Sequence, residues 1–306
     1  MLNFTKRPSS VEWPTVCLAL VIYGGWLATT WFWAALPLWL LAALGGWFVA
    51  WQSSLQHETI HGHPTRWRAV NRLVGLPPLT LLIPYESYRR MHLVHHRDER
   101  LTDPIDDPES YYWTPAAYAA LPRAARWLVT CQTTLLGRLL LGPPWVMARY
   151  LRGECSSVLA GKPGQRRLWA AHGLHAGLVL AWTWGVCGIA PWLYLAAFVY
   201  PGFALVLMRS FAEHRAGEGV RERIAVVEHA PLLGLLYLHN NLHAVHHETP
   251  QLPWYAIPAG YRANRARLLA QNGGLVYRGY LDVARKFLLT PHDHPVHPHG
   301  RVAQAA

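Results

Sequence analysis

Residues 13–57 read WPTVCLALVIYGGWLATTWFWAALPLWLLAALGGWFVAWQSSLQH and contain no Asp, Glu, Lys or Arg. A membrane-spanning helix needs about 20 consecutive, mainly apolar residues, so this stretch is long enough to cross a bilayer twice. Residues 168–208 also lack these four residue types. We therefore expect four transmembrane helices arranged as two hairpins, over about residues 13–29, 33–51, 168–187 and 191–208.

The basic residues are distributed in a way that supports this topology. All 28 Lys and Arg residues lie in residues 1–12, 58–167 and 209–306, which share one side of the membrane if the hairpins are correct. Because basic segments favour the cytoplasmic side, we expect an integral, multi-pass membrane protein whose termini and polar segments are cytoplasmic. A basic surface facing anionic lipids also explains the net charge of +11, so we expect membrane lipids and no nucleic acid as partners.

The polar segments after each hairpin are expected to form a helical cap. The predicted fold class is an all-α integral membrane protein, with four spans and a cytoplasmic cap formed by residues 52–167 and 209–290. We expect residues 1–290 to form a single domain. Residues 291–306, PHDHPVHPHGRVAQAA, are rich in His and Pro without helical spacing, so we expect a flexible tail and no metal site there.

The 18 histidines are unevenly distributed, and several fall in short boxes. HETIH occupies residues 57–61, HLVHH occupies residues 92–96 and HAVHH occupies residues 243–247. On a helix, the first histidine of an HxxHH box faces the same way as the final pair, whereas the two adjacent histidines diverge by about 100°. Adjacent rings can therefore reach two different metal ions. One zinc ion takes about four ligands, fewer than these boxes supply, which indicates two metals.

His57, Glu58 and His61 also fit the HExxH pattern of zinc peptidases, in which two histidines bind zinc and the glutamate activates water. The longer metzincin pattern would need a glycine and a third histidine where this chain has Pro64 and Trp67. A zinc-dependent membrane hydrolase with Glu58 as its base stays an alternative. A metal transporter would place its ligands near the middle of the bilayer, whereas these boxes follow the ends of predicted spans.

The three boxes, HxxxH, HxxHH and HxxHH, occur in order between paired spans, and in this the chain resembles the membrane fatty-acid desaturase and hydroxylase superfamily. The resemblance extends from the first hairpin to about residue 258. It implies a non-haem di-iron centre, with two Fe ions held almost entirely by histidine, which uses O2 to remove hydrogen from an unactivated C–H bond of a lipid chain. The implied metal ligands are His57, His61, His92, His95, His96, His243, His246 and His247, together with His214, which matches the additional histidine after the fourth span in stearoyl-type desaturases.

The same resemblance implies roles for residues beside these ligands. Glu58 would accept a hydrogen bond from a liganding histidine and orient its ring. Asn240 or Asn241, near the third box, would bind a water. His239 would be a further ligand or would support one.

The resemblance favours an acyl (fatty-acid) desaturase, with a hydroxylase, a carotenoid ketolase and a terminal-alkene-forming fatty-acid decarboxylase as alternatives on the same scaffold. The boxes do not separate these reactions. The 306 residues contain no cytochrome b5-like, flavin or ferredoxin module. A separate ferredoxin-type or similar electron donor is therefore implied, and an acidic carrier would suit the basic cytoplasmic surface.

Overall fold

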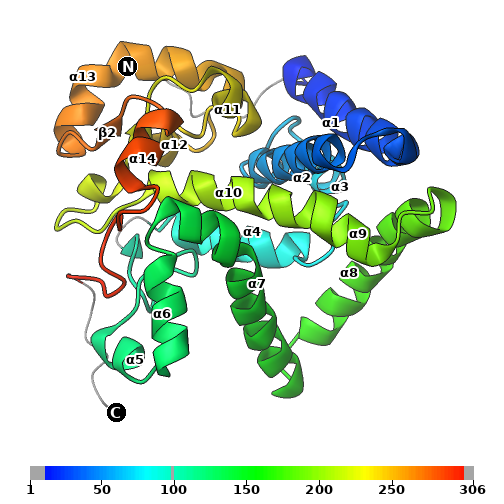
Figure 1. Cartoon of the computed structure of the whole chain (residues 1–306). Helices are drawn as coiled ribbons and strands as arrows, with labels where there is room; N and C mark the ends of the chain where they lie inside the picture. The colour runs from blue at the N-terminus through cyan, green and yellow to red at the C-terminus, as the bar shows by residue number, and fades with distance from the viewer. Residues whose placement is uncertain (1–10, 98–99, 300–306) are drawn as a thin grey trace. The chain divides into compact units, whose positions relative to one another are not determined.

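The computed structural model describes residues 11–97 and 100–299, and this part of the chain is mostly helical (Figure 1). It divides into two compact units. The single domain over residues 1–290 stays a prediction. Among the described residues, unit 1 is formed by 11–89 and 143–206, and unit 2 by 90–142 and 207–299. Unit 1 holds most of the charge-free stretches, whereas unit 2 holds seven of the nine predicted histidine ligands.

Three helical segments among the described residues are long and apolar enough to cross a membrane, and they agree with three of the four predicted spans. They are α1 (Trp13–Trp31), α2 (Leu38–Ile60) and the helix Pro191–Glu213, which comprises α9 (Pro191–Tyr194), the π-helical segment η4 (Leu195–Val199) and α10 (Tyr200–Glu213). The other predicted span, 168–187, lies in α8 (Gln165–Leu180) and the π-helix η3 (Ala181–Val186). It stays a prediction. Unit 1 also contains α3 (Arg68–Gly75), the start of α4 (Tyr85–His95) and the end of α7 (Leu135–Leu159).

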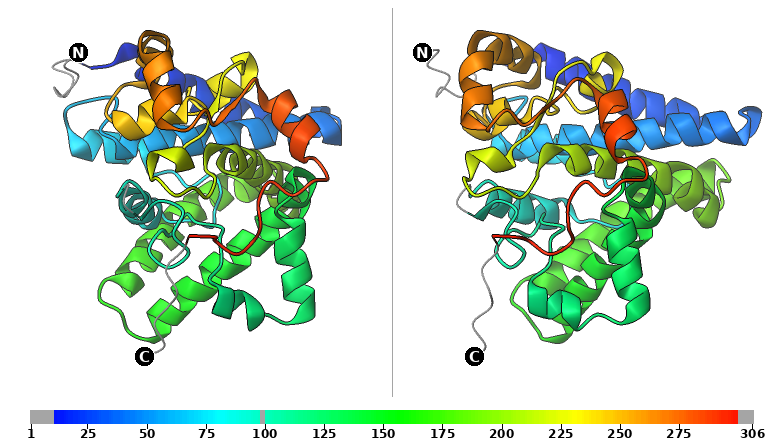
Figure 2. Two further views of the ribbon diagram at one scale, coloured as in Figure 1. Left: turned by 90° about the vertical axis from the view of Figure 1, so that its left-hand side faces the viewer. Right: turned by 60° about the vertical axis from the view of Figure 1, so that its left-hand side comes forward.

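Proline marks the starts of the apolar helices. Pro14 lies in the first turn of α1 and Pro191 in the first turn of α9, while Pro37 is the N-cap of α2. Proline suits these positions because its φ angle is already close to the helical value and a first-turn N–H has no partner within the helix. The 3-10 turn η1 (Trp33–Ala35) joins α1 to α2, and these two helices run side by side in every view (Figures 1 and 2).

α2 packs closely against η4 and α10 through two glycines. A Cβ atom on Gly45 would lie 2.7 Å from the Ala197 carbonyl oxygen and from the Phe198 ring, and one on Gly46 would lie 2.8 Å from Pro201. Small residues let helix backbones approach one another in a membrane, where packing contributes more to helix association than exclusion of water does. The surrounding core of unit 1 includes Leu41, Val49, Tyr194, Phe198 and Phe203.

We expect Gly45→Ala to destabilise the protein. The added methyl group must displace the Ala197 carbonyl or the Phe198 ring, and overpacking of this kind costs about 1–3 kcal/mol. Gly24→Ala is the matched control, because nothing lies within 4 Å of a Cβ atom at Gly24. Thermal unfolding of both variants in one detergent tests this expectation, and equal unfolding temperatures would contradict it.

The non-helical segment 76–84 is held inside unit 1 by hydrogen bonds to its carbonyl groups. Tyr194 Oη donates to Leu79 O at 2.8 Å, and His172 Nε2 donates to Leu81 O at 2.9 Å. Backbone groups away from water need such partners, particularly in a membrane protein. His172, an ionisable residue within a predicted span, therefore supports the backbone of this segment.

Unit 2 consists of short helices and one small sheet. Besides the end of α4, the start of α7 and the end of α10, its elements are α5 (Pro115–Ala119), α6 (Arg123–Cys131), η5 (Arg221–Arg223), β1 (Val226–Val227), α11 (Pro231–Leu236), α12 (His243–Glu248), η6 (Trp254–Ala256), α13 (Ile257–Gln271), β2 (Val276–Tyr277) and α14 (Tyr280–Phe287). β1 and β2 are parallel, with Val226 opposite Val276. The apolar core of unit 2 includes Leu101, Ile224, Val226, Leu242, Val245, Leu252, Ile257 and Leu268.

Residues 291–299, the described part of the predicted flexible tail, pack against the rest of unit 2. His292 and His297 are each only 4% exposed. Backbone hydrogen bonds join His292 N to Thr133 O at 2.7 Å and Trp113 N to Pro295 O at 2.9 Å. Partners distant in the sequence therefore bind this described part of the segment, and the flexible tail over residues 291–306 stays a prediction. The rest of the predicted tail and both of the predicted cytoplasmic termini lie outside the described residues.

Candidate metal centre

α12 separates its apolar residues from its histidines. In the sequence HAVHHE, Ala244 and Val245 belong to the core of unit 2, while His243, His246 and His247 occupy the other positions around the helix. All three histidines are nevertheless buried. Buried polar groups need partners, and here neighbouring imidazole rings surround each of them.

The other histidines of unit 2 come from two further segments. His92 and His95 lie on the last turn of α4, and His96 follows it, with His96 N bonded to His92 O at 3.0 Å. His214 directly follows α10 and forms an isolated antiparallel bridge with Ile224. This bridge fixes the backbone of His214 immediately after a helix that is long enough to cross a membrane.

Four side chains converge to form the four-histidine group, which consists of His95, His214, His243 and His247. All four residues are buried, and their ligand nitrogens lie within 4.8 Å of one another. His214 Nε2 lies 3.1 Å from His95 Nε2 and 2.9 Å from His243 Nε2. The distance from His247 Nε2 to His243 Nε2 is 3.1 Å. Metal–nitrogen bonds of about 2.1 Å place neighbouring ligand nitrogens about 3.0–3.4 Å apart, so this spacing fits one metal ion.

His92, His96 and His246 form a second group within unit 2. His96 Nε2 lies 3.0 Å from His92 Nε2 and 2.9 Å from His246 Nε2. The two histidines of each adjacent pair therefore belong to different groups. His95 and His247 are in the four-histidine group, whereas His96 and His246 are in the second group. This separation agrees with the divergence of about 100° between adjacent helical positions.

Oxygen atoms hold the second ring nitrogen of several of these histidines. The partners of the Nδ1 atoms are Asp107 for His95 (3.0 Å), Glu109 for His92 (3.0 Å), the Arg223 carbonyl for His214 (3.2 Å) and Asn240 for His243 (3.1 Å). An oxygen acceptor keeps the ring proton on Nδ1 and leaves the Nε2 lone pair free to bind a metal. The rings are thus oriented as metal ligands are in proteins.

The donor set fits a bound cation. In a neutral ring that donates through Nδ1, Nε2 carries a lone pair, and His214 Nε2 faces His243 Nε2 at 2.9 Å and His95 Nε2 at 3.1 Å. Burial lowers the pKa of His214 and His243 well below its usual value, so both rings are neutral. Burial opposes protonation of His95 too, but the carboxylates of Glu109 and Asp107 raise its pKa to about 9. The electrostatics of the group therefore favour a positive charge at its centre.

The first histidine box lies in unit 1. His57 is on the last turn of α2, His61 is the C-cap of this helix, and their ring centroids are 4.8 Å apart. Glu58 Oε1 lies 3.8 Å from His57 Nδ1, and both side chains are buried. The spacing i, i+4 therefore brings two imidazole rings together at the end of α2, with a carboxylate beside them.

The residues before the third box have different surroundings. Asn240 accepts a hydrogen bond from the four-histidine group through Oδ1. Asn241 joins this segment to the sheet, because its Nδ2 donates to Val227 O at 2.6 Å. Among the described residues, His239 lies outside both histidine groups, with its ring centroid 6.1 Å from that of Trp254.

Sequence reasoning missed three carboxylates that surround the histidines. Asp107 and Glu109 come from the acidic loop before α5, and Glu213, the last residue of α10, lies with Oε1 3.5 Å from His243 Nδ1. Glu213 also pairs with Arg209 at 3.1 Å. A signal was present in the sequence, since DDPES follows the second box closely and Glu213 directly precedes His214.

We expect Asp107→Ala to weaken metal binding without removing a ligand. The His95 ring would lose its orienting acceptor and a nearby negative charge, and losses of this kind cost about 10–100-fold in metal affinity. Asp106→Ala is the matched control, because Asp106 carries the same charge one residue away and pairs with Arg100 at 3.6 Å. Cobalt(II) titrations of both variants test the expectation, and equal affinities would show that Asp107 does not orient His95.

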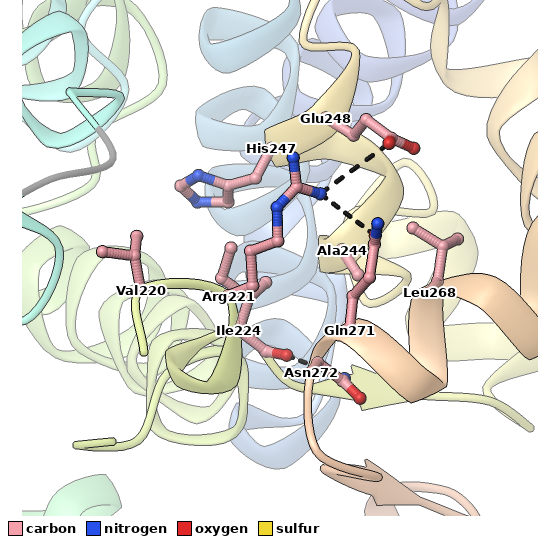
Figure 3. Close-up of a pocket in the computed structure, with 9 residues that line it drawn as sticks. All are labelled: Val220, Arg221, Ile224, Ala244, His247, Glu248, Leu268, Gln271 and Asn272. Carbon is pink, nitrogen blue, oxygen red and sulfur yellow. Dashed lines mark hydrogen bonds and ion pairs between the residues drawn. The ribbon is translucent and has the colours of Figure 1, made fainter. Parts of the chain in front are cut away.

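A pocket of unit 2 reaches His247 (Figure 3). Its lining comes from η5, α12 and α13 and from the residues next to them. Arg221 extends across the pocket in this view, with Nη1 3.0 Å from Gln271 Oε1 and 3.8 Å from Glu248 Oε1. His247, a buried member of the four-histidine group, is therefore also one of the residues that line this pocket.

Comparison with known proteins relates this arrangement to one family. A protein-family model described as "Fatty acid desaturase" matches residues 31–280. A search of the curated proteins found no match. The matched range includes all three boxes, His214 and the carboxylates at positions 107, 109 and 213, so it covers the whole candidate site as well as most of the chain.

Proposed function

This chain belongs to the fatty acid desaturase family, and on that premise we propose that it is an O2-dependent di-iron oxidoreductase acting on an unactivated C–H bond of a lipid chain. Within this reaction class, we propose that the enzyme desaturates an acyl chain. The observation that carries the proposal is the four-histidine group, in which His214 Nε2 lies within 3.1 Å of two other Nε2 atoms. The family and the three apolar helices make it a membrane enzyme of the oxidoreductase class.

Nine histidines are the proposed ligands of the two Fe ions. The four-histidine group would hold one ion, and His92, His96 and His246 would contribute to holding the other. His57 and His61 are included as further ligands because they match the first box of the family, HxxxH. Glu58 is proposed as the acceptor that orients His57.

When bound, the pair of redox-active ions supplies the activation of O2 and the oxidising power for hydrogen removal. The protein's own residues orient the ligands. Asp107, Glu109 and Asn240 accept hydrogen bonds from ring N–H groups and so determine which nitrogen faces the metal. The carboxylates of Asp107 and Glu109 would also offset the charge of bound cations, while the burial of most of the rings excludes bulk water from the centre.

The position of the lipid chain would determine which product forms. The carbon held in near-attack geometry is the one that loses hydrogen. Loss of a second hydrogen from the neighbouring carbon gives desaturation, whereas insertion of oxygen gives hydroxylation or, after further oxidation, ketolation. Removal of a β-hydrogen and one further electron from a free acid, followed by loss of CO2, gives a terminal alkene. These other outcomes stay alternatives within the same proposed class.

A zinc-dependent membrane hydrolase is the alternative from another class. Catalytic zinc keeps three protein ligands and one open position, whereas the four-histidine group would fill every position of a tetrahedral zinc ion. The carboxylates of Asp107 and Glu109 accept hydrogen bonds from ring N–H groups, which orients the histidine ligands. A hydrolytic base would instead need a carboxylate that is available to a water molecule. Both observations favour the oxidoreductase.

Electrons are proposed to come from a separate ferredoxin-type or similar donor on the cytoplasmic side. The proposed topology has four membrane crossings, which would put the polar segments that carry the boxes on that side. The net charge of +11 would attract an acidic carrier.

Product analysis tests the proposed function. The purified protein is reconstituted anaerobically with ferrous iron, a ferredoxin system and acyl-chain substrates, and O2 is then added. Mass spectrometry distinguishes loss of two hydrogens, gain of oxygen and loss of CO2. Equal turnover with and without O2 would reject the proposed reaction class.

A further inference from the structure

We call residues 291–299 the C-terminal strap and residues 100–112 the acidic loop. The strap forms backbone hydrogen bonds with Trp113, the residue that follows the loop, and Trp113 and Val296 form a parallel bridge. Trp113 N donates to Pro295 O at 2.9 Å, and His297 N donates to Trp113 O at 3.1 Å. The strap thus lies beside the loop that supplies Asp107 and Glu109.

A side-chain contact joins the strap to the segment of His214 as well. Tyr112 Oη donates to Asp293 Oδ2 at 2.5 Å and accepts a hydrogen bond from Ala216 N at 2.7 Å. Ala216 lies two residues after His214. The strap is therefore connected to the backbone near one ligand and to the loop that orients another.

Thr102 connects the strap to Asp107. Its φ of 64° lies in the left-handed region, which is unfavourable for a β-branched residue and persists only where surrounding contacts hold it. Thr102 N donates to Asp107 Oδ2 at 2.9 Å, and Thr102 Oγ1 lies 2.9 Å from His297 Nε2. Because Asp107 also holds His95 Nδ1, consecutive hydrogen bonds connect His297 to the four-histidine group.

The surroundings of His297 determine the direction of its hydrogen bond. His299 N donates to His297 Nδ1 at 3.0 Å, so Nδ1 is an acceptor. Burial, together with the nearby charge of Arg223, lowers the pKa of His297 to about 4, and the ring is neutral. A neutral ring that accepts through Nδ1 carries its proton on Nε2 and donates it to Thr102 Oγ1.

We infer that His297 is a positioning residue of the metal centre, which acts through Thr102 and Asp107 to hold the His95 ring in its metal-binding orientation. This inference rests on the proposed function, since it requires His95 to be a metal ligand. Without the His297 ring, the Thr102 hydroxyl would lose its buried donor and the unfavourable loop conformation would lose one of its supports. Asp107 would then hold His95 less firmly.

Cobalt(II) binding to the full-length protein tests the inference. We expect His297→Ala to lower cobalt affinity about 3–10-fold, less than the roughly 10–100-fold expected for a direct partner of a ligand. The visible absorption of the bound cobalt should also change, because its d–d bands respond to ligand geometry. His297→Gln should largely restore both properties, since its amide N–H can donate to Thr102 Oγ1.

His299→Ala is the matched control, because the exposed His299 donates to His297 Nδ1 through its backbone N–H, which the substitution keeps, and its ring centroid lies 6.3 Å from that of His297. It should leave affinity and spectrum unchanged. A purely structural role of the strap would lower the unfolding temperature without moving the spectrum. If His297→Ala does not fold, the test uses Thr102→Val and Thr102→Ser. Only the serine variant keeps the hydroxyl, so we expect the valine variant alone to lower cobalt affinity and change the spectrum.

Two outcomes separate the inference from the proposed function. Wild-type cobalt affinity and spectrum in folded His297→Ala, or in Thr102→Val, would overturn the inference and leave the proposed function intact. Failure of the wild-type protein to bind cobalt at all would reject the metal centre itself.

Discussion

His243→Ala is expected to abolish turnover and to reduce the iron content of the purified protein. His243 is central to the four-histidine group, with Nε2 2.9 Å from His214 Nε2 and 3.1 Å from His247 Nε2. Its removal deletes a ligand and also leaves the Asn240 side chain without its ring partner. Loss of a residue that is only hydrogen-bonded to a metal ligand lowers activity up to about 100-fold, and we expect His243→Ala to lower it further.

His229→Ala is the matched control for this substitution. His229 is an exposed histidine of unit 2 and lies outside both histidine groups. Iron content, turnover and unfolding temperature are measured for both variants in parallel. A folded His243→Ala protein with wild-type iron content and turnover would show that the four-histidine group is not the metal centre.

The apolar helices could be predicted because a membrane imposes a simple rule on composition. α1 and α2 both lie within or close to the charge-free residues 13–57. α2 nevertheless continues well past its predicted end, to Ile60. Its buried polar residues find backbone partners, since Gln52 donates to Pro77 O and Gln56 donates to Gly75 O. Composition does not reveal these partners, because they lie in the next segment of the chain.

The histidine groups could be predicted because their geometry is local. The spacing within HLVHH and HAVHH is sufficient to send adjacent rings in different directions. The supporting carboxylates depend instead on the path of a loop, which includes Thr102 at a φ of 64°. That conformation is held by His297, a residue 195 positions away, in a segment whose His and Pro content is typical of a flexible tail. Local patterns contain no information about such a contact.

Removal of metal by a chelator is expected to abolish turnover, and ferrous iron should restore it whereas zinc should not. Imidazole binds both metals, so zinc should occupy the four-histidine group. Zinc has no redox chemistry and cannot support activation of O2. Zinc is therefore expected to behave as an inhibitor that competes with iron.

Unfolding temperatures show whether a metal binds to the site, whereas turnover shows whether the bound metal supports the reaction. A ligand that binds only the folded protein stabilises it by about 2.7 kcal/mol at 100 times its dissociation constant, so both metals should raise the unfolding temperature. The Asp107→Ala variant should show a smaller rise at the same metal concentration, because its affinity is lower. Iron alone should restore O2-dependent product formation. If zinc restored turnover without O2, the hydrolase would be the better description, and the carboxylate of Glu58 would be the first candidate for its base.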